Sequence, residues 1–286
     1  MQDHVSTTTA GITSAGASLR IGSVALTVRD LDRVSRFYRD AIGLAPISTD
    51  GNVHQLGAGG RVLVELRHDP DAAIADRRQA GLFHTAFLLP RRQDLADWLV
   101  HAAAKGVRLD GASDHLVSEA LYLTDPEGNG IEIYHDRPSE NWPREADGRI
   151  GMATLRIDLD DLAAAAGPGP FAGMPDGTIV GHVHLQVGDL DAAEDFVAGT
   201  LGMPVTSTFR GAVFFGADGY HHHLGANIWN SRGAGPRAEG TTGLAGIRLL
   251  AAPAAFRRLE ARLSRNGDGL LEVRDPWGTR LVFEEK

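Results

Sequence analysis

Residues 21–45, IGSVALTVRDLDRVSRFYRDAIGLA, decide the fold because a second stretch of the chain repeats them. Residues 180–204 read VGHVHLQVGDLDAAEDFVAGTLGMP, and at a constant offset of 159 residues the Gly, Asp-Leu-Asp, Phe and Gly positions coincide. The register continues without a gap as far as Gly60 and Gly219. Chance does not hold so many matches over about forty positions, so the stretch indicates an internal duplication.

Each copy presents the same order of local signals. An alternating β-rich stretch (VALTV or VHLQV) opens it, and an Asp suited to capping a helix follows, at Asp30 or Asp189. Apolar residues at helical spacing then continue to a stop near Gly43. Shorter strands separated by glycines come next. The repeat therefore predicts a βαβββ module.

A second pair of stretches predicts two further modules. GLFHTAFLLP at residues 81–90 resembles GLAGIRLLAA at residues 243–252, and each precedes a helical pattern and an Asp-Pro-x-Gly turn. We expect an α+β fold of four tandem βαβββ modules, the fourth shortened. Their ranges are 19–78, 79–140, 179–236 and 241–286. The halves 19–140 and 179–286 form two domains on this interpretation, with a flexible tail at 1–18 and a Pro/Gly/Ala-rich linker at 141–178.

Composition excludes several classes of function. The net charge of -9 disfavours a nucleic-acid partner, since no basic stripe offsets it. The absence of cysteine excludes disulfides, thiolate metal sites and a cysteine nucleophile. No apolar run is long enough to span a bilayer, so no membrane association is expected. The first 18 residues lack the features of a signal peptide, and the cytoplasm is the expected location.

Equivalent positions of the repeat divide the modules into two kinds. Two positions correspond across the modules: one on the first strand, and one on the last strand, four residues after the glycine of a turn. Candidate ligands stand at these positions only in modules two and three. These candidates are His84, Glu132, His182 and His223, whereas modules one and four hold Ser23, Val64, Gly246 and Val282. A lone strand histidine is more often structural than a ligand, but the joint pattern favours one metal site. Two imidazoles and one carboxylate make a facial triad that suits non-haem Fe(II), although Mn, Zn or Ni can occupy such a site.

These residues and motifs resemble the vicinal-oxygen-chelate superfamily of glyoxalases, bleomycin-resistance proteins and extradiol dioxygenases, over residues 19–286. The stretches DHLVSEALYLTDPEGNGIEIY and GYHHHLGANIWN look closest to type I extradiol dioxygenases of the catechol 2,3-dioxygenase kind. The resemblance implies iron bound by His84, Glu132 and His182, with Tyr122 as a catalytic residue that hydrogen-bonds or helps deprotonate a substrate hydroxyl. It differs from the usual enzymes in drawing its ligands from the central modules. That difference implies two pseudo-symmetric open barrels, with module two paired with three and module one with four.

The resemblance also implies roles for further residues. His223 is the best match to the family's acid–base histidine, and His221 shares its strand face, so the choice between them stays open. His222 points the other way and is expected to be a surface or packing residue. The expected pocket residues are His184, His115, Asn227 and Tyr134.

The implied function is cleavage of a catechol-type aromatic diol with Fe(II) and dioxygen. One alternative is a glyoxalase-type isomerase or lyase, which completes the ligand set of its metal with a second carboxylate in the fourth quadrant of the site. This quadrant is the position of module three that corresponds to Glu132 of module two, and the sequence alignment places His223 there. Another is a non-catalytic ligand-binding protein of the same superfamily, which lacks the metal ligands. Exposed module edges are compatible with a homo-oligomer.

Overall fold

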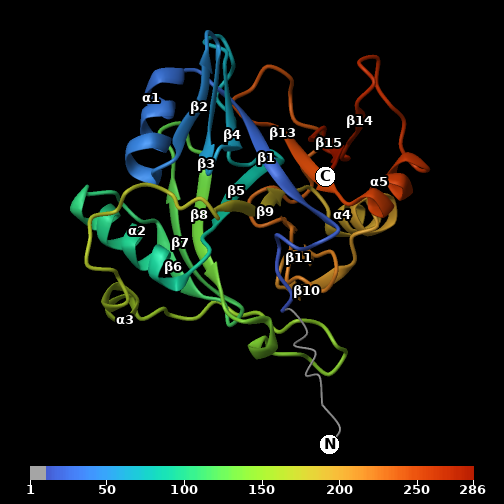
Figure 1. Cartoon of the computed structure of the whole chain (residues 1–286). Helices are drawn as coiled ribbons and strands as arrows, with labels where there is room; N and C mark the ends of the chain where they lie inside the picture. The colour runs from blue at the N-terminus through green and yellow to red at the C-terminus, as the bar shows by residue number, and fades with distance from the viewer. Residues whose placement is uncertain (1–10) are drawn as a thin grey trace, which may run out of the picture.

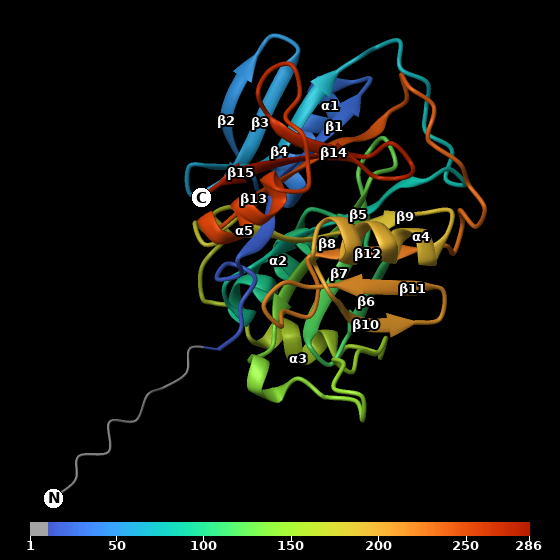
Figure 2. The ribbon, with the colours of Figure 1, turned by 90° about the vertical axis from the view of Figure 1, so that its right-hand side faces the viewer.

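The structure, a computed structural model, describes residues 11–286 and contains two sheets. The first has seven strands in the order β14-β15-β13-β1-β4-β3-β2, and the second has eight in the order β10-β11-β12-β9-β5-β8-β7-β6. Figure 2 shows the blue and red strands of the first sheet above the green and orange strands of the second. The strands of the first sheet are β1 (Leu19–Val28), β2 (Ala45–Asp50), β3 (Val53–Ala58), β4 (Arg61–His68), β13 (Gly243–Ala251), β14 (Leu271–Arg274) and β15 (Arg280–Glu285). Those of the second are β5 (Gly81–Leu88), β6 (Gly111–Asp114), β7 (Ser118–Thr124), β8 (Gly130–Asp136), β9 (Ile179–Gln186), β10 (Val205–Phe209), β11 (Ala212–Phe215) and β12 (Leu224–Asn227).

Each sheet takes one module from each half of the chain. Strands β1 and β13 pair antiparallel at the centre of the first sheet, and β5 and β9 do so in the second. Module one is therefore paired with four, and two with three, which confirms the arrangement expected from the sequence. Each module pairs with a module of the other half of the chain, so a curled sheet is complete only when both halves are present (Figure 1).

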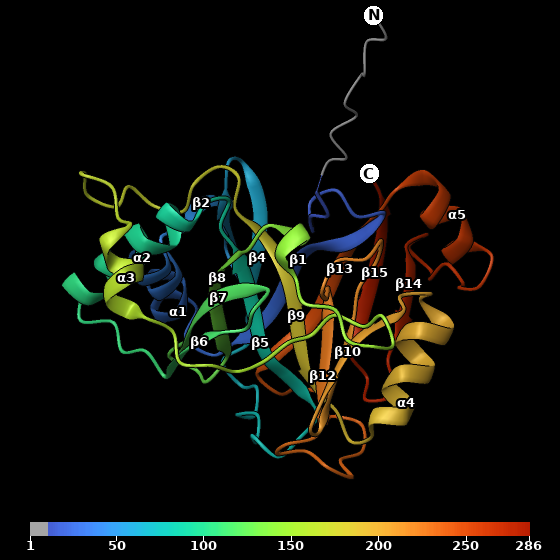
Figure 3. The ribbon, with the colours of Figure 1, turned by 90° about the horizontal axis from the view of Figure 1, so that it is seen from below.

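The helices lie on the outer sides of the two sheets. Figure 3 shows α1 (Leu31–Phe37), α2 (Arg92–Ala104) and α3 (Leu159–Ala164) on one side, and α4 (Leu190–Glu194) and α5 (Pro253–Glu260) on the other. The aspartates of the repeat cap their helices as predicted: Asp30 accepts from the Arg33 N–H and Asp189 from the Ala192 N–H. After α1 and α4 the chain continues in π-helical turns, η1 (Tyr38–Ile42) and η3 (Asp195–Thr200). Module four contains one strand fewer than βαβββ, as its shorter sequence suggests.

Alternation along the strands separates a core face from a concave face in the second sheet. Phe87, Ile131 and Ile133 face the core, where the largest cluster of buried apolar side chains extends across both sheets. Residues at the intervening positions face away from that core. Every candidate metal ligand predicted from the sequence in modules two and three, apart from His223, lies on this second face. Among the described residues, no helix is long and apolar enough to cross a membrane.

The tail and the linker are more structured than their compositions predict. Residues 1–10 lie outside the described residues, but Ser14 and Ala17 are buried, so residues 11–18 pack onto the fold. The linker contains α3 and the short helix η2 (Ser139–Asn141) ends at its start. Its side chains Trp142 and Ile150 are buried against Tyr220 in a small apolar cluster of their own. Burial of these apolar groups stabilises a defined path for the linker over the second sheet.

Candidate metal centre

The three predicted ligands come from the three central strands of the second sheet. In the pairing register, Ala86 on β5 lies opposite both His182 on β9 and Glu132 on β8. Cross-strand partners share a face, and His84 lies two residues before Ala86, so its side chain emerges on that face too. The fully buried Ala86 presents only a methyl group between the flanking ligands. The register therefore brings together residues that are 50 and 98 positions apart in the chain.

The donor atoms of the triad form a compact triangle. Nε2 of His84 and Nε2 of His182 are 3.0 and 3.1 Å from the same Glu132 oxygen, Oε2, and the two nitrogens are 3.3 Å apart. Cis ligands of an octahedral metal ion lie about 3.0 Å apart when the bonds are about 2.1 Å long. The triangle matches one face of such an octahedron, and three positions opposite that face remain for other ligands.

Burial and charge at the triad also fit a cation. Glu132 and His182 are each 2% exposed, and a buried carboxylate is costly without a positive partner. Burial raises the pKa of Glu132, but the neighbouring His182 and His84 outweigh it and hold that pKa well below its usual range. Burial lowers the pKa of His182 to about 4 against the opposing effect of Glu132. At neutral pH the site thus offers one anionic oxygen and a neutral imidazole, the forms that bind metal.

Enlarging the side chain between the ligands tests this geometry. Ala86→Val places two more methyl groups between His182 and Glu132, and we expect metal content to fall at least about tenfold because the donors can no longer converge. Ala25 is the matched control, since it lies opposite Glu65 in the first sheet as Ala86 lies opposite Glu132. Ala25→Val should retain the metal. Metal analysis after dialysis distinguishes the two, and equal retention in both variants would contradict the assignment of the site.

The strand register corrects the sequence alignment in the fourth quadrant of the site. Val24 pairs with Val64, but Val183 pairs with Leu224, one residue beyond the constant offset of the repeat. Thr85 on β5 occupies the place that Val183 occupies on β9, and Thr85 pairs with Ile131, the residue before Glu132. Because Val183 pairs with Leu224, the residue after Leu224 is the equivalent of Glu132. That residue is Gly225 and not His223. A Cβ at Gly225 would lie 3.1 Å from the ring of His184, so the glycine makes room for this imidazole.

The one-residue shift also changes which histidine of the run reaches the site. His222 lines the cavity in front of the triad, and its ring centre is 4.0 Å from that of His182. His221 and His223, expected on the site face, are fully buried and do not line the cavity. His221 bonds to Asp136, and Nδ1 of His223 accepts from the Ala217 N–H. The expectation that His222 points away from the site, as a surface or packing residue, is therefore wrong.

The burial of His223 has a consequence for stability at acid pH. Burial, with the nearby His221, lowers its pKa to about 3 from an ordinary value near 6.5. The histidine therefore binds its proton more tightly in the unfolded chain than in the folded protein. The neutral His223 contributes to the free energy of unfolding above pH 6.5, and this contribution is lost as the pH falls toward 3. Between pH 7 and pH 4 the loss is about 3 kcal/mol at 1.4 kcal/mol per unit. His223→Gln should flatten the pH dependence of urea unfolding by that amount; parallel curves for the two proteins would contradict it.

Tyr122 and His115 form a hydrogen-bonded pair on the cavity wall. Tyr122 lies opposite Glu132 in the register, and its hydroxyl is 2.6 Å from His115 Nε2. His115 Nδ1 is 2.6 Å from the carbonyl of Ala153, which only accepts, so Nδ1 carries the proton and the Tyr122 hydroxyl donates to Nε2. Burial and the charge of Glu132 raise the pKa of Tyr122 well above 10, so it keeps its proton. Ala153 belongs to the linker, which composition alone gave no reason to place at the site.

The other expected pocket residues divide between the cavity and its surroundings. His184 lines the cavity, and burial holds its pKa well below the usual value. Asn227 and Tyr134 do not line it: Asn227 accepts from the Trp229 N–H, and Tyr134 bonds to Tyr220. The cavity has a volume of about 730 Å³. Its wall includes residues that the sequence pattern did not single out for the site, namely Phe83, Phe214, His222 and the linker segment 152–154.

Comparison with known proteins establishes the family. The model of the Glyoxalase/Bleomycin resistance protein/Dioxygenase superfamily matches residues 20–133 and 179–283, and the chain belongs to that superfamily. A catechol-2,3-dioxygenase of Bacillus subtilis (strain 168) is 40% identical over 237 residues, 82% of this chain and 83% of that protein. A biphenyl-2,3-diol 1,2-dioxygenase 3 of Rhodococcus globerulus is 27% identical over 128 residues, 41% of this chain and 63% of that protein. The resemblance read from the sequence motifs is confirmed.

Solved structures share the fold at low sequence identity. A protein from Bacillus subtilis subsp. subtilis str. 168 superposes with a TM-score of 0.62 at 14% identity, covering 94% of this chain and 86% of its own. Glyoxalase I from Zea mays superposes with a TM-score of 0.56 at 16% identity, covering 94% and 93%. These similarities support the four-module architecture and carry no information on chemistry.

Proposed function

We propose that this chain is an extradiol ring-cleaving dioxygenase that acts on a catechol-type diol with iron(II) and dioxygen. The observation that carries the proposal is the triangle of His84, His182 and Glu132 at the wall of a cavity with no fourth protein donor at Gly225. Two imidazoles and one carboxylate with open positions are typical of non-haem iron(II) oxygenases. The 40% identity to a catechol-2,3-dioxygenase supports the same assignment.

The three donors would hold iron(II), which supplies a single centre at which the diol and dioxygen are brought together. The chain supplies the surroundings of the bound diol. The Tyr122 hydroxyl donates to His115, and its oxygen keeps lone pairs that can accept a hydrogen bond from a diol hydroxyl. His222 is an imidazole on the cavity wall beside His182, and we assign it the acid–base role for which His223 was the best match in the sequence.

Aromatic side chains on the other side of the triad suit an aromatic ligand. The ring of Phe83 lies 5.3 Å from His84, 5.2 Å from His184 and 5.3 Å from Trp229, and all four line the cavity. Edge-to-face contacts of this kind favour a flat ring over a polar aliphatic chain. The position of this cluster beside His84 would orient the diol oxygens toward the metal.

The fourth quadrant discriminates against the glyoxalase-type alternative. That chemistry is expected to use a second carboxylate at the position equivalent to Glu132, and the register assigns Gly225 there. The imidazole of His184 lies against Gly225, and burial lowers the pKa of this imidazole. The alternative of a ligand-binding protein without a metal is disfavoured by the complete triad.

Oxygen uptake by anaerobically iron-loaded protein tests the proposal. Addition of catechol should give stoichiometric oxygen consumption and a ring-opened product that carries both oxygen atoms, as measured by mass spectrometry with labelled dioxygen. No uptake with a range of substituted catechols, together with turnover of a hemithioacetal, would favour the isomerase. Absence of bound metal after reconstitution would favour the ligand-binding protein.

A further inference from the structure

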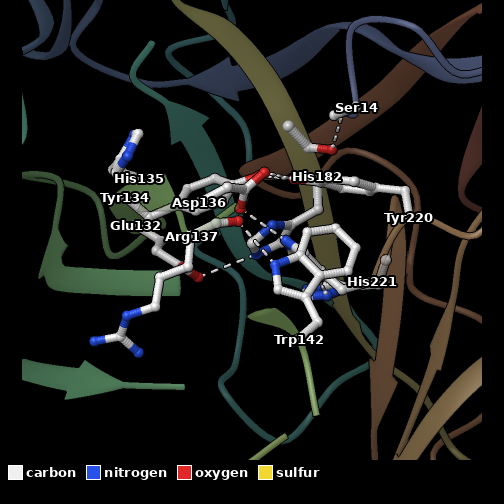
Figure 4. A network of polar contacts seen from close by, with 12 residues as sticks. Ser14, Glu132, Tyr134, His135, Asp136, Arg137, Trp142, His182, Tyr220 and His221 are labelled. Carbon is white, nitrogen blue, oxygen red and sulfur yellow. Dashed lines mark hydrogen bonds and ion pairs between the residues drawn. The ribbon is translucent and has the colours of Figure 1, made fainter. Parts of the chain in front are cut away.

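A carboxylate and two histidines form a hydrogen-bonded series that leads from the C-terminal end of strand β8 to the cavity. Asp136 ends β8, four residues after Glu132. Its Oδ1 is 2.8 Å from Nε2 of His221, and Nδ1 of His221 is 2.8 Å from Nδ1 of His222. Figure 4 shows Asp136 and His221 beside His182. His222, the last member, lines the cavity, whereas Asp136 and His221 do not.

The donor and acceptor rules fix where the protons lie in this series. The carboxylate of Asp136 only accepts, so Nε2 of His221 carries a proton. In neutral His221 the other nitrogen, Nδ1, is then an acceptor, and Nδ1 of His222 must donate to it. A neutral imidazole carries a proton on only one of its two nitrogens, so an Nδ1 that donates to His221 leaves the second nitrogen of His222 unprotonated. That nitrogen, Nε2, makes no hydrogen bond within residues 11–286.

Neighbouring side chains hold the series in place. The Tyr220 hydroxyl donates to the second oxygen of Asp136 at 2.8 Å, and Tyr134 bonds to Tyr220 at 2.9 Å. A Cβ at Gly181 would lie 1.8 Å from the Tyr134 hydroxyl, so this arrangement requires the glycine that precedes His182. The indole of Trp142, from the linker, packs at 5.1 Å from the ring of His221. Both Asp136 oxygens thus have fixed partners, and its orientation is determined.

We propose that Asp136 and His221 are positioning residues that fix His222 as its Nδ1–H tautomer, with an unprotonated Nε2 available in the cavity. An imidazole in the opposite tautomer would present an N–H there and could not accept a proton. The role of that nitrogen as the base toward a bound diol rests on the proposed function. The tautomer itself does not, since it follows from the hydrogen bonds of the protein alone.

Nitrogen NMR of the histidine rings tests the tautomer directly. The probe is the full chain labelled with ¹⁵N, at pH 8, recorded with and without zinc(II), which is diamagnetic; His221→Gln and His222→Gln variants assign the signals. We expect His222 protonated at Nδ1 and His221 at Nε2. His222 protonated at Nε2 in both samples would overturn the proposal, whatever the activity of the protein.

Asp136→Asn tests the positioning role, because an amide can either accept from His221 or donate to it. We expect the His222 tautomer to become mixed and kcat of the iron-loaded protein to fall about 10- to 100-fold, with KM and iron content unchanged. Asp147→Asn makes the same chemical change at an exposed carboxylate paired with Arg149 and should alter none of these. An unchanged kcat and tautomer in Asp136→Asn would overturn the inference alone. Absence of dioxygenase activity in the unmodified protein, with the expected tautomer, would overturn only the proposed function.

Discussion

Glu132→Gln is expected to abolish stoichiometric metal binding and, with it, turnover. The amide keeps the size of the side chain, so the central strands should still pair, but it removes the only anionic donor of the triad. A neutral oxygen beside two imidazoles binds iron(II) far more weakly than a carboxylate does. We expect metal content after dialysis to fall from about one ion per chain to below about a tenth, and kcat to fall more than about 100-fold.

The matched control for Glu132 lies in the other sheet. Glu65 lies opposite Ala25 as Glu132 lies opposite Ala86, but within residues 11–286 its carboxylate accepts hydrogen bonds from Gln55 and Arg67 and not from a histidine. Glu65→Gln should therefore retain both metal and activity. Elemental analysis and oxygen uptake on the two variants provide the comparison. A full metal complement in Glu132→Gln would show that the carboxylate is not a ligand.

His222→Gln should lose activity while keeping its metal. The side chain of His222 packs against His182 but is not one of the three candidate metal ligands, so the iron content should match that of the unmodified protein. If His222 moves a proton to and from the diol, its loss should lower kcat about 100- to 10,000-fold, the range for general acid–base residues. KM for catechol should change little, because binding depends on the metal and the aromatic wall.

His223→Gln separates this assignment from the one that the sequence favours. His223 does not line the cavity, so kcat at neutral pH should stay within about threefold of the unmodified protein, even though its acid stability changes. Steady-state kinetics on both variants, with matched iron content, decide between the two histidines. A larger loss of kcat in His223→Gln than in His222→Gln would reverse the assignment.

The convergence of His84, Glu132 and His182 could be predicted by comparing equivalent positions of the repeat, and the pairing of the modules followed from the resemblance to the superfamily. His84 and His182 occupy the same place on equivalent strands, and strand alternation places Glu132 on their face. The histidine run could not be assigned in this way. One additional residue after Gly219 shifts the register of β12, and a shift of one residue moves each side chain to the opposite face. Only the observed pairing of Val183 with Leu224 reveals it.

The linker shows a different limit of composition as a guide. Its Pro, Gly and Ala residues are typical of a flexible connection, yet Trp142 packs on Tyr220 and His221, and Ala153 bonds to His115. These contacts are with residues 38 to 79 positions away in the chain, as in the pairs His115–Ala153 and Trp142–His221, and no local pattern encodes them. Residues 11–18 show the same effect on a smaller scale, since Ser14 is buried despite the polar, small-residue composition around it.

Anomalous X-ray scattering at the iron edge, on crystals grown anaerobically with iron(II), tests most directly whether one cation is shared by the two central modules. We expect one strong peak per chain, at about 2.0–2.3 Å from Nε2 of His84, Nε2 of His182 and a carboxylate oxygen of Glu132. Iron bound elsewhere, or a peak that contacts only one of these three side chains, would contradict the account.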